Sequence, residues 1–207
     1  MRYLFGPVRA SYAESHLRQA RQAGDCLCFN VEPGGDLQIG LNDRWEDVRA
    51  RLPAEVQLDA IVLALDYTAI PRAIWTQPAP IVGLASDWDL LWHHYRRQLR
   101  RCDLVLTGAA GAARMRQDGI DHVQAVNLAG CPRRIAESSE AETARDIDIL
   151  FVGNLNMNVQ RARLPWLARL ARLGRKFRVA IHTAVAEDEY PKLLRRARIV
   201  FNRSRQQ

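Results

Sequence analysis

The sequence is poor in several features that mark whole classes of protein. None of its apolar runs approaches the roughly 18 residues that a membrane-spanning helix needs. The N-terminus lacks a basic stretch followed by an apolar block and a cleavage site, so we expect a cytoplasmic protein. No C-x-x-C pair and no histidine at metal-ligand spacing is present, so we expect neither a zinc site nor a disulfide framework. The four cysteines are Cys26, Cys28, Cys102 and Cys131.

Acidic residues are scarce in one part of the chain. Residues 1–140 hold 16 arginines and 17 acidic residues, whereas residues 141–207 hold 14 basic and 6 acidic residues. The basic part favours an anionic partner, such as a nucleotide diphosphate, a nucleic acid or an anionic membrane surface. We expect no nucleic acid, because aromatic residues do not alternate with basic ones and no recognition motif is present. An acidic remainder beyond this sequence would explain the same imbalance, and that alternative stays open.

The chain does contain a regular alternation of apolar runs and helical patterns, which is typical of a parallel α/β sheet. The first lobe opens with an apolar run that ends in a glycine, at residues 2–7, and we expect it to hold about six strands. The further predicted strands cover residues 26–31, 60–65, 81–84, 104–106 and 123–128. The predicted helices cover residues 12–23, 44–52, 89–101 and 109–117.

A second lobe follows a polar segment at residues 133–146, which is typical of an interdomain linker. We therefore predict an N-terminal domain at residues 1–132 and a C-terminal domain at residues 147–207. The C-terminal domain has predicted strands at 147–152, 177–181 and 199–201 and predicted helices at 161–173 and 187–197. This is about half of a typical doubly wound domain, so we expect two Rossmann-like lobes of which the second is incomplete. A cleft between two such lobes is a natural place for a ligand.

Gly153 directly follows the apolar run at 147–152, and a glycine there lets the backbone turn and approach phosphate groups. We expect backbone amides, a helix N-terminus and two guanidinium groups to converge on a diphosphate there, with charge-assisted contacts of about 1.5–3 kcal/mol each. The alternative is that the asparagines occupy turns with positive φ and that the arginines are solvated. The predicted donor-binding residues are Gly153, Asn154, Asn156, Arg161 and Arg163.

Asp87 follows the predicted strand at 81–84 and precedes a helix, which is where ligand sites form in α/β proteins. We predict that its carboxylate is catalytic: it orients an acceptor hydroxyl or acts as the general base that removes the proton of that hydroxyl. Helix capping is the competing interpretation, since Ser86 and Asp89 have the spacing of a capping box.

Four further residues are candidates for acceptor binding in the same groove: Gly6, Ser11, Asp66 and His93. The first three lie near predicted strand ends, although turn or cap roles explain them equally well. His93 and His94 are adjacent on one helix and point to different faces, so they do not form the i, i+4 pair of a helical metal site. A surface or core histidine is the alternative for His93.

Residues 161–178 carry an apolar stripe at Leu164, Leu167, Leu170 and Ala171 with basic residues elsewhere. Such a helix is suited to lie on an anionic membrane, which makes peripheral contact with the inner membrane face a possible property of this chain. Packing of the stripe against its own sheet is the alternative.

The chain resembles the GT-B glycosyltransferases, and within them the group that contains the spore maturation protein CgeB and related glycosyltransferase-4-like sequences. The resemblance lies in residues 59–66, 80–89, 102–107, 148–154 and 197–202. It implies an acceptor-binding N-terminal lobe, a C-terminal lobe that binds a nucleotide-sugar, and transfer of the sugar in the cleft. The acceptor is unidentified: a sugar, a lipid-linked glycan or a protein. No cofactor and no metal are expected, because a helix terminus and guanidinium groups neutralise the leaving diphosphate.

The sequence departs from the family pattern by ending before the acidic, glycine-containing segment that typically holds the donor's ribose and sugar. We therefore expect this chain by itself to be impaired or inactive as a transferase. The competing hypothesis is a non-catalytic binding module, or a lobe that acts only with a partner.

Overall fold

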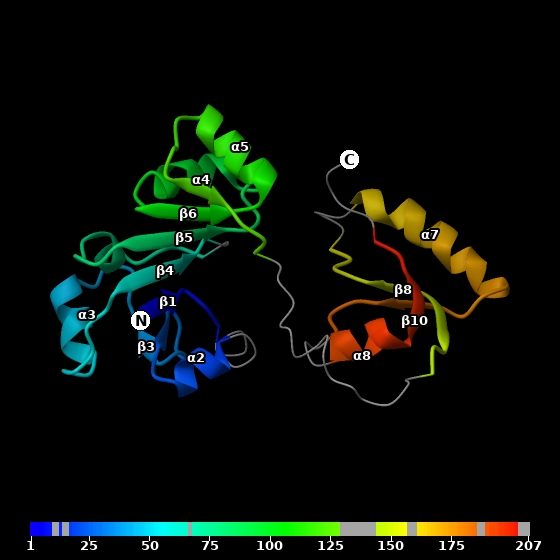
Figure 1. Cartoon of the computed structure of the whole chain (residues 1–207), viewed down its shortest axis with the longest axis horizontal. Coiled ribbons are helices and arrows are strands. Elements are labelled where there is room, and N and C mark those ends of the chain that lie inside the picture. The colour runs from blue at the N-terminus through cyan, green and yellow to red at the C-terminus, as the bar shows by residue number, and fades with distance from the viewer. Residues whose placement is uncertain are drawn as a thin grey trace. The chain divides into compact units, whose positions relative to one another are not determined.

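The computed structural model describes residues 1–9, 13, 17–65, 68–128, 144–156, 161–185 and 189–202. The chain divides into a first unit, residues 1–130, and a second unit, residues 131–207 (Figure 1). Each unit is an α/β structure built on a parallel sheet, as the alternating pattern predicted.

The first unit contains a seven-stranded sheet in the order β3-β2-β1-β4-β5-β6-β7, with every neighbouring pair parallel. This is the doubly wound order, whose topological switch point lies between β1 and β4. The carboxyl ends of all the strands therefore lie at one edge. The strands are β1 (Tyr3–Gly6), β2 (Cys26–Asn30), β3 (Leu37–Gln38), β4 (Ala60–Ala64), β5 (Ile81–Ala85), β6 (Leu104–Thr107) and β7 (Val123–Ala125). The two-residue β3 was not predicted, because so short a strand has no periodicity to detect.

The helices of the first unit follow the predicted pattern with one clear shift. The predicted helix at 89–101 begins only at Trp92, because residues 87–90 form a turn closed by the Leu90 N–H and the Asp87 carbonyl (3.1 Å). Of the predicted helix at 12–23, residues 12 and 14–16 lie outside the described residues, and the described part contains a helix at Arg18–Gln22. The helices are α2 (Arg18–Gln22), α3 (Trp45–Arg51), the 3₁₀ turn η1 (Arg72–Trp75), α4 (Trp92–Leu99) and α5 (Ala109–Gln117).

Two apolar clusters hold the first unit together. The larger one joins Leu63 and Ile61 of β4 to Val48 of α3 and to Tyr95 of α4, all with no exposed surface. The smaller one, around Phe5 and the two β2 cysteines, lies where α2 packs. The buried runs of β1 and β4 are continuous rather than alternating, as expected for central parallel strands covered on both faces.

The second unit contains a three-stranded parallel sheet in the order β10-β8-β9. Its switch point lies between β8 and β10, because β8 leads to β9 on one side and β10 returns on the other. The elements are β8 (Ile147–Val152), the 3₁₀ turn η2 (Arg161–Arg163), α7 (Leu164–Arg172), the 3₁₀ turn η3 (Leu173–Arg175), β9 (Val179–His182), α8 (Glu189–Arg196) and β10 (Ala197–Val200). The predicted strand at 199–201 starts two residues earlier than expected.

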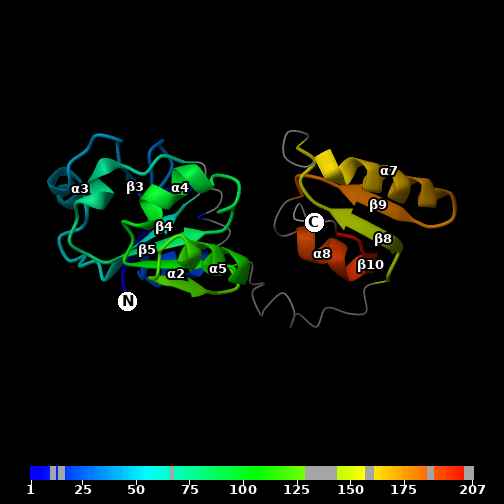
Figure 2. The same cartoon turned by 90° about the horizontal axis from the view of Figure 1, so that it is seen from above.

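Helices α7 and α8 cover opposite faces of this sheet (Figures 1 and 2). On the α7 side, Leu167 and Leu170 pack against Phe151 of β8. On the α8 side, Leu193 packs with Leu150 and with Ile147. The two clusters contain only three and four buried residues, so each of these side chains carries a large share of the packing in the described part of the unit.

The last residue of the predicted linker takes part in the second unit. Asp146 accepts two hydrogen bonds from the Arg196 guanidinium of α8, at 2.8 and 2.5 Å. The side chain of Arg196 holds the pKa of this carboxyl below its usual value. Residues 133–143 of the predicted linker lie outside the described residues.

Aspartates close the amino ends of strand pairs in both units. In each case the Oδ2 atom of an aspartate at the start of one strand accepts the N–H at the start of the neighbouring strand. The pairs are Asp59 with the Arg2 N–H (2.7 Å), Asp103 with the Ile81 N–H (2.7 Å) and Asp148 with the Arg178 N–H (2.8 Å). These carboxylates satisfy donors that would otherwise begin the ladder unpaired.

Within the described residues, no helix combines the length and the apolar character needed to cross a membrane.

Candidate functional site

The loop after β8 is shaped by close packing at Gly153. A Cβ atom at this position would lie 2.9 Å from the Phe151 ring and 3.3 Å from a guanidinium nitrogen of Arg163. The Gly153 N–H donates to the carbonyl of His182, at the end of β9 (3.1 Å). The glycine is therefore required by its neighbours, and its backbone is fixed at the carboxyl edge of the sheet.

Arg163 is brought onto this loop. Its Nη1 atom donates to the Asn154 carbonyl (3.0 Å), and its guanidinium lies 5.8 Å from the centre of the Phe151 ring. The side chain is half-buried, so the position of its charge is restricted. Arg161 lies in the same 3₁₀ turn and is exposed. The structure thus brings Gly153, Asn154 and Arg163 together, and Asn156 joins them through a hydrogen bond to Asn154.

The two asparagines shape the loop. The Asn154 Oδ1 atom accepts the Asn156 N–H (2.7 Å), which is the hydrogen bond of an Asx turn. Positive φ does not explain them, because Ala184 is the one described non-glycine residue with φ in that region. That part of the alternative interpretation was wrong, although its broader point, that these residues serve the turn, applies to Asn154.

Two residues that sequence reasoning did not choose lie at the same edge. His182 ends β9, pairs with Val152 in the ladder and is half-buried. Asn202 is exposed, two residues after β10, and follows Phe201, whose N–H donates to the Leu150 carbonyl (2.8 Å). Both are polar residues directly after an apolar run, which is the signal that selected Asp87 in the first lobe.

Asp87 lies in the loop that follows β5 and is exposed. The neighbouring Trp88 anchors this loop: a Cβ atom on Gly111 of α5 would lie 2.7 Å from its indole nitrogen. Trp88 also meets Trp92 edge to face, with ring centres 6.3 Å apart. Asp87 is therefore held at the carboxyl edge of the sheet with its carboxylate open to solvent.

The capping box predicted for Ser86 and Asp89 is not at the start of α4. The N-cap of that helix is Leu91, and no side chain caps it. The reason is the turn at residues 87–90, which delays the helix.

Of the four predicted acceptor-side residues, the structure describes Gly6 and His93. Gly6 is buried, and a Cβ atom there would lie 2.4 Å from the Phe29 carbonyl oxygen, so packing against β2 requires this glycine. His93 is exposed in the first turn of α4, beside the exposed His94. Ser11 and Asp66 lie outside the described residues.

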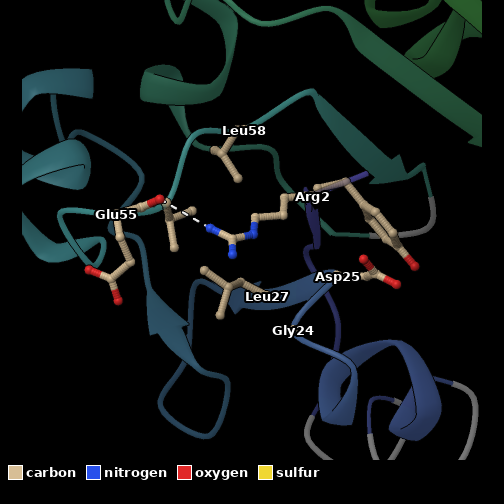
Figure 3. Close-up of a pocket in the computed structure, with 8 residues that line it drawn as sticks. Arg2, Gly24, Asp25, Leu27, Glu55 and Leu58 are labelled. Carbon is tan, nitrogen blue, oxygen red and sulfur yellow. Dashed lines mark hydrogen bonds between the residues drawn. The ribbon is translucent and has the colours of Figure 1, made fainter.

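A pocket of about 210 Å³ lies at the opposite edge of the first sheet (Figure 3). Arg2 extends across it and donates to the Glu55 carbonyl (3.0 Å). Tyr3, Asp25 and Leu58 bring the amino ends of β1, β2 and β4 to its wall. Ligands of open α/β sheets bind at the carboxyl ends of the strands, so this pocket is on the unfavourable edge. None of the predicted site residues lines it.

The described cysteines are buried in the first unit with free thiols, and Cys131 lies outside the described residues. Burial raises the pKa of the Cys102 thiol to about 12. The Cys26 and Cys28 sulfurs are 3.9 Å apart, and their hydrogen bond lowers the pKa of Cys26 and raises that of Cys28. No group of three or more metal-binding side chains occurs among the residues that the structure describes.

No protein-family model matches the chain, and no curated protein matches it in sequence.

Proposed function

We propose that the second unit binds the diphosphate of a nucleotide-activated sugar at the loop after β8, and that the chain takes part in transferring that sugar to a hydroxyl acceptor. The observation that carries the proposal is the Arg163 guanidinium, held over Gly153 and Asn154 at the carboxyl end of β8. This position adjoins the switch point between β8 and β10, where ligands of open α/β sheets bind.

The charge of the second unit supports this choice of ligand. The described segment 161–178 contains seven basic residues and no acidic residue. A guanidinium presents planar, bidentate donors that match phosphate oxygens, and charge-assisted bonds of this kind are about twice as strong as neutral ones.

The transfer step needs two groups. The acceptor oxygen forms a bond to the anomeric carbon, while the bond between that carbon and the diphosphate oxygen breaks. The developing negative charge on the leaving diphosphate is neutralised by Arg163 and Arg161. The proton of the acceptor hydroxyl passes to the Asp87 carboxylate, which is exposed and follows a strand.

Calorimetric titration with UDP, GDP, ADP and their sugars tests the binding part. Arg163→Gln is expected to weaken the affinity for the binding nucleotide by about 10–100-fold, because one charge-assisted contact is lost. Arg175→Gln removes the same charge at the other end of α7 and is the matched control, with unchanged affinity expected. No binding of any diphosphate, or equal losses in both variants, would overturn the proposal.

Turnover assays separate transfer from binding alone. Asp87→Asn is expected to lower the rate of sugar transfer while leaving nucleotide affinity unchanged, because only the proton acceptor is removed. Nucleotide binding without transfer by the intact chain, for every acceptor class tried, would instead identify a binding module.

A further inference from the structure

We propose that α7 and the turn after it form a peripheral contact with an anionic lipid bilayer. The surface consists of the apolar side chains of Trp166, Leu173 and Phe177 with the basic side chains around them, and is called here the α7 surface. This property is independent of the proposed sugar transfer.

The apolar stripe visible in the sequence does not make this surface. Leu167 and Leu170 are only 6% exposed and pack against the sheet of their own unit. Packing therefore explains the centre of the stripe, as the alternative interpretation held.

Three large apolar side chains remain exposed along the same segment. Trp166 is 40% exposed, Leu173 is 42% exposed and Phe177 is 48% exposed. Trp166 and Leu173 are seven residues apart and so lie on one flank of the helix. The Phe177 N–H donates to the Leu173 carbonyl (3.0 Å), so Phe177 lies one turn beyond Leu173. Helix α7 covers one face of the second sheet, opposite to the face covered by α8 (Figures 1 and 2).

The same segment carries several cations. The Arg169 guanidinium lies 5.1 Å from the centre of the Trp166 ring. Arg172, Arg175 and Lys176 are exposed in the same segment. Because residues 161–178 include no acidic residue, no carboxylate within the segment offsets this charge.

The chemistry of the α7 surface matches the headgroup region of a bilayer. Tryptophan is favoured at that depth, and arginine or lysine beside exposed Trp, Leu and Phe is the pattern of an in-plane anchor. A second copy of the chain would bring like charges together, which opposes self-association through this surface. A nucleic acid would use the cations but gains little from Leu173 and Phe177. Helix α7 has nine residues, so the contact lies on the membrane rather than across it.

Flotation with lipid vesicles tests the proposal on the intact chain. Binding is expected to vesicles that contain phosphatidylglycerol in phosphatidylcholine, and much more weakly to phosphatidylcholine alone. Arg172→Gln with Arg175→Gln should weaken binding about fivefold per charge removed. The matched control is Arg96→Gln with Arg97→Gln on α4, two exposed arginines of the first unit, which should leave binding unchanged.

The depth of Trp166 gives a second, specific readout. Brominated lipids in the anionic vesicles should quench the tryptophan fluorescence of the wild-type protein, whereas Trp166→Phe should keep binding and lose most of that quenching. Quenching retained in Trp166→Phe, equal binding to both vesicle types, or equal loss in the α4 control would overturn the proposal. Failure to bind vesicles together with self-association that depends on Leu173 would also overturn it, in favour of a second copy as the occupant.

Discussion

The first unit buries its seven-stranded sheet under one cluster of 21 buried residues and another of six, whereas the described second unit relies on clusters of four and three. Both units carry arginine–aspartate pairs, such as Arg21 with Asp36 in the first and Arg196 with Asp146 in the second, so the ion pairs do not separate them. The second unit also leaves Ile199 and Val200 of β10 59% and 49% exposed. Both units have the same alternation of strands and helices, yet the stability of the second depends far more on each single buried side chain.

The largest effect is expected from removing one core ring of the smaller unit. Phe151 has no exposed surface and supports Arg163 as well as α7. Phe151→Ala should cost about 3–5 kcal/mol and unfold the second unit while the first stays folded. Hydrogen exchange followed by mass spectrometry should show lost protection in β8 and β9 and unchanged protection in β4.

The control for this experiment is Leu63→Ala in β4, a fully buried residue of the larger cluster. It should reduce protection in the first unit and leave β8 unchanged. Loss of protection in both units by either variant would contradict the independence that the comparison assumes.

A medium effect is expected where the first unit is packed most tightly. Gly6→Ala forces a Cβ atom to 2.4 Å from the Phe29 carbonyl oxygen, so backbone has to move. Overpacking of this kind should cost about 1–3 kcal/mol, measured by denaturant unfolding. Gly108→Ala puts its methyl group into open space at the N-cap of α5 and should cost no more than about 1 kcal/mol, because alanine is a poorer N-cap than glycine. Similar losses in both variants would show that Gly6 is not held by packing.

The smallest effect is expected from the exposed ion pair of the second unit. The pKa of Asp146 is lowered in the folded protein by the Arg196 side chain, from an ordinary value of 3.8. Its contribution to stability is therefore present above that pH and is lost as the pH falls through the lower folded pKa. Asp146→Asn should flatten the acid dependence of second-unit unfolding, measured by hydrogen exchange at a series of pH values. Asp121→Asn in the first unit should not change it.

Much of the fold was predictable because long apolar runs have few alternatives. The strand at 147–152 and the helix at 109–117 have the predicted bounds, since glycine or a polar turn follows each directly. The start of α4 was misplaced because a turn at Asp87 and a capped helix use the same residue types. The order β10-β8-β9 depends on pairing across long connections, which no local pattern encodes.

The candidate site was less predictable than the fold. A glycine after β8 was expected for phosphate approach, yet its nearest neighbours are the Phe151 ring and the Arg163 guanidinium. No spacing rule relates residue 163 to the carbonyl of residue 154. The sequence does not show that His182 lies beside Gly153, because their contact depends on the pairing of β9 with β8.

The aspartates at the strand starts have a consequence for how such sheets assemble. A parallel strand arrives after a long crossover, so no tight turn tells it where to align against its neighbour. A slip by one residue would send every side chain to the wrong face. The carboxylates of Asp59, Asp103 and Asp148 each accept a hydrogen bond from one particular N–H of the adjoining strand. Each bond therefore favours one register of the two strands. In each unit, these bonds set the register of the strands at their amino ends. A ligand would bind at the opposite edge of the sheet, where the strands end.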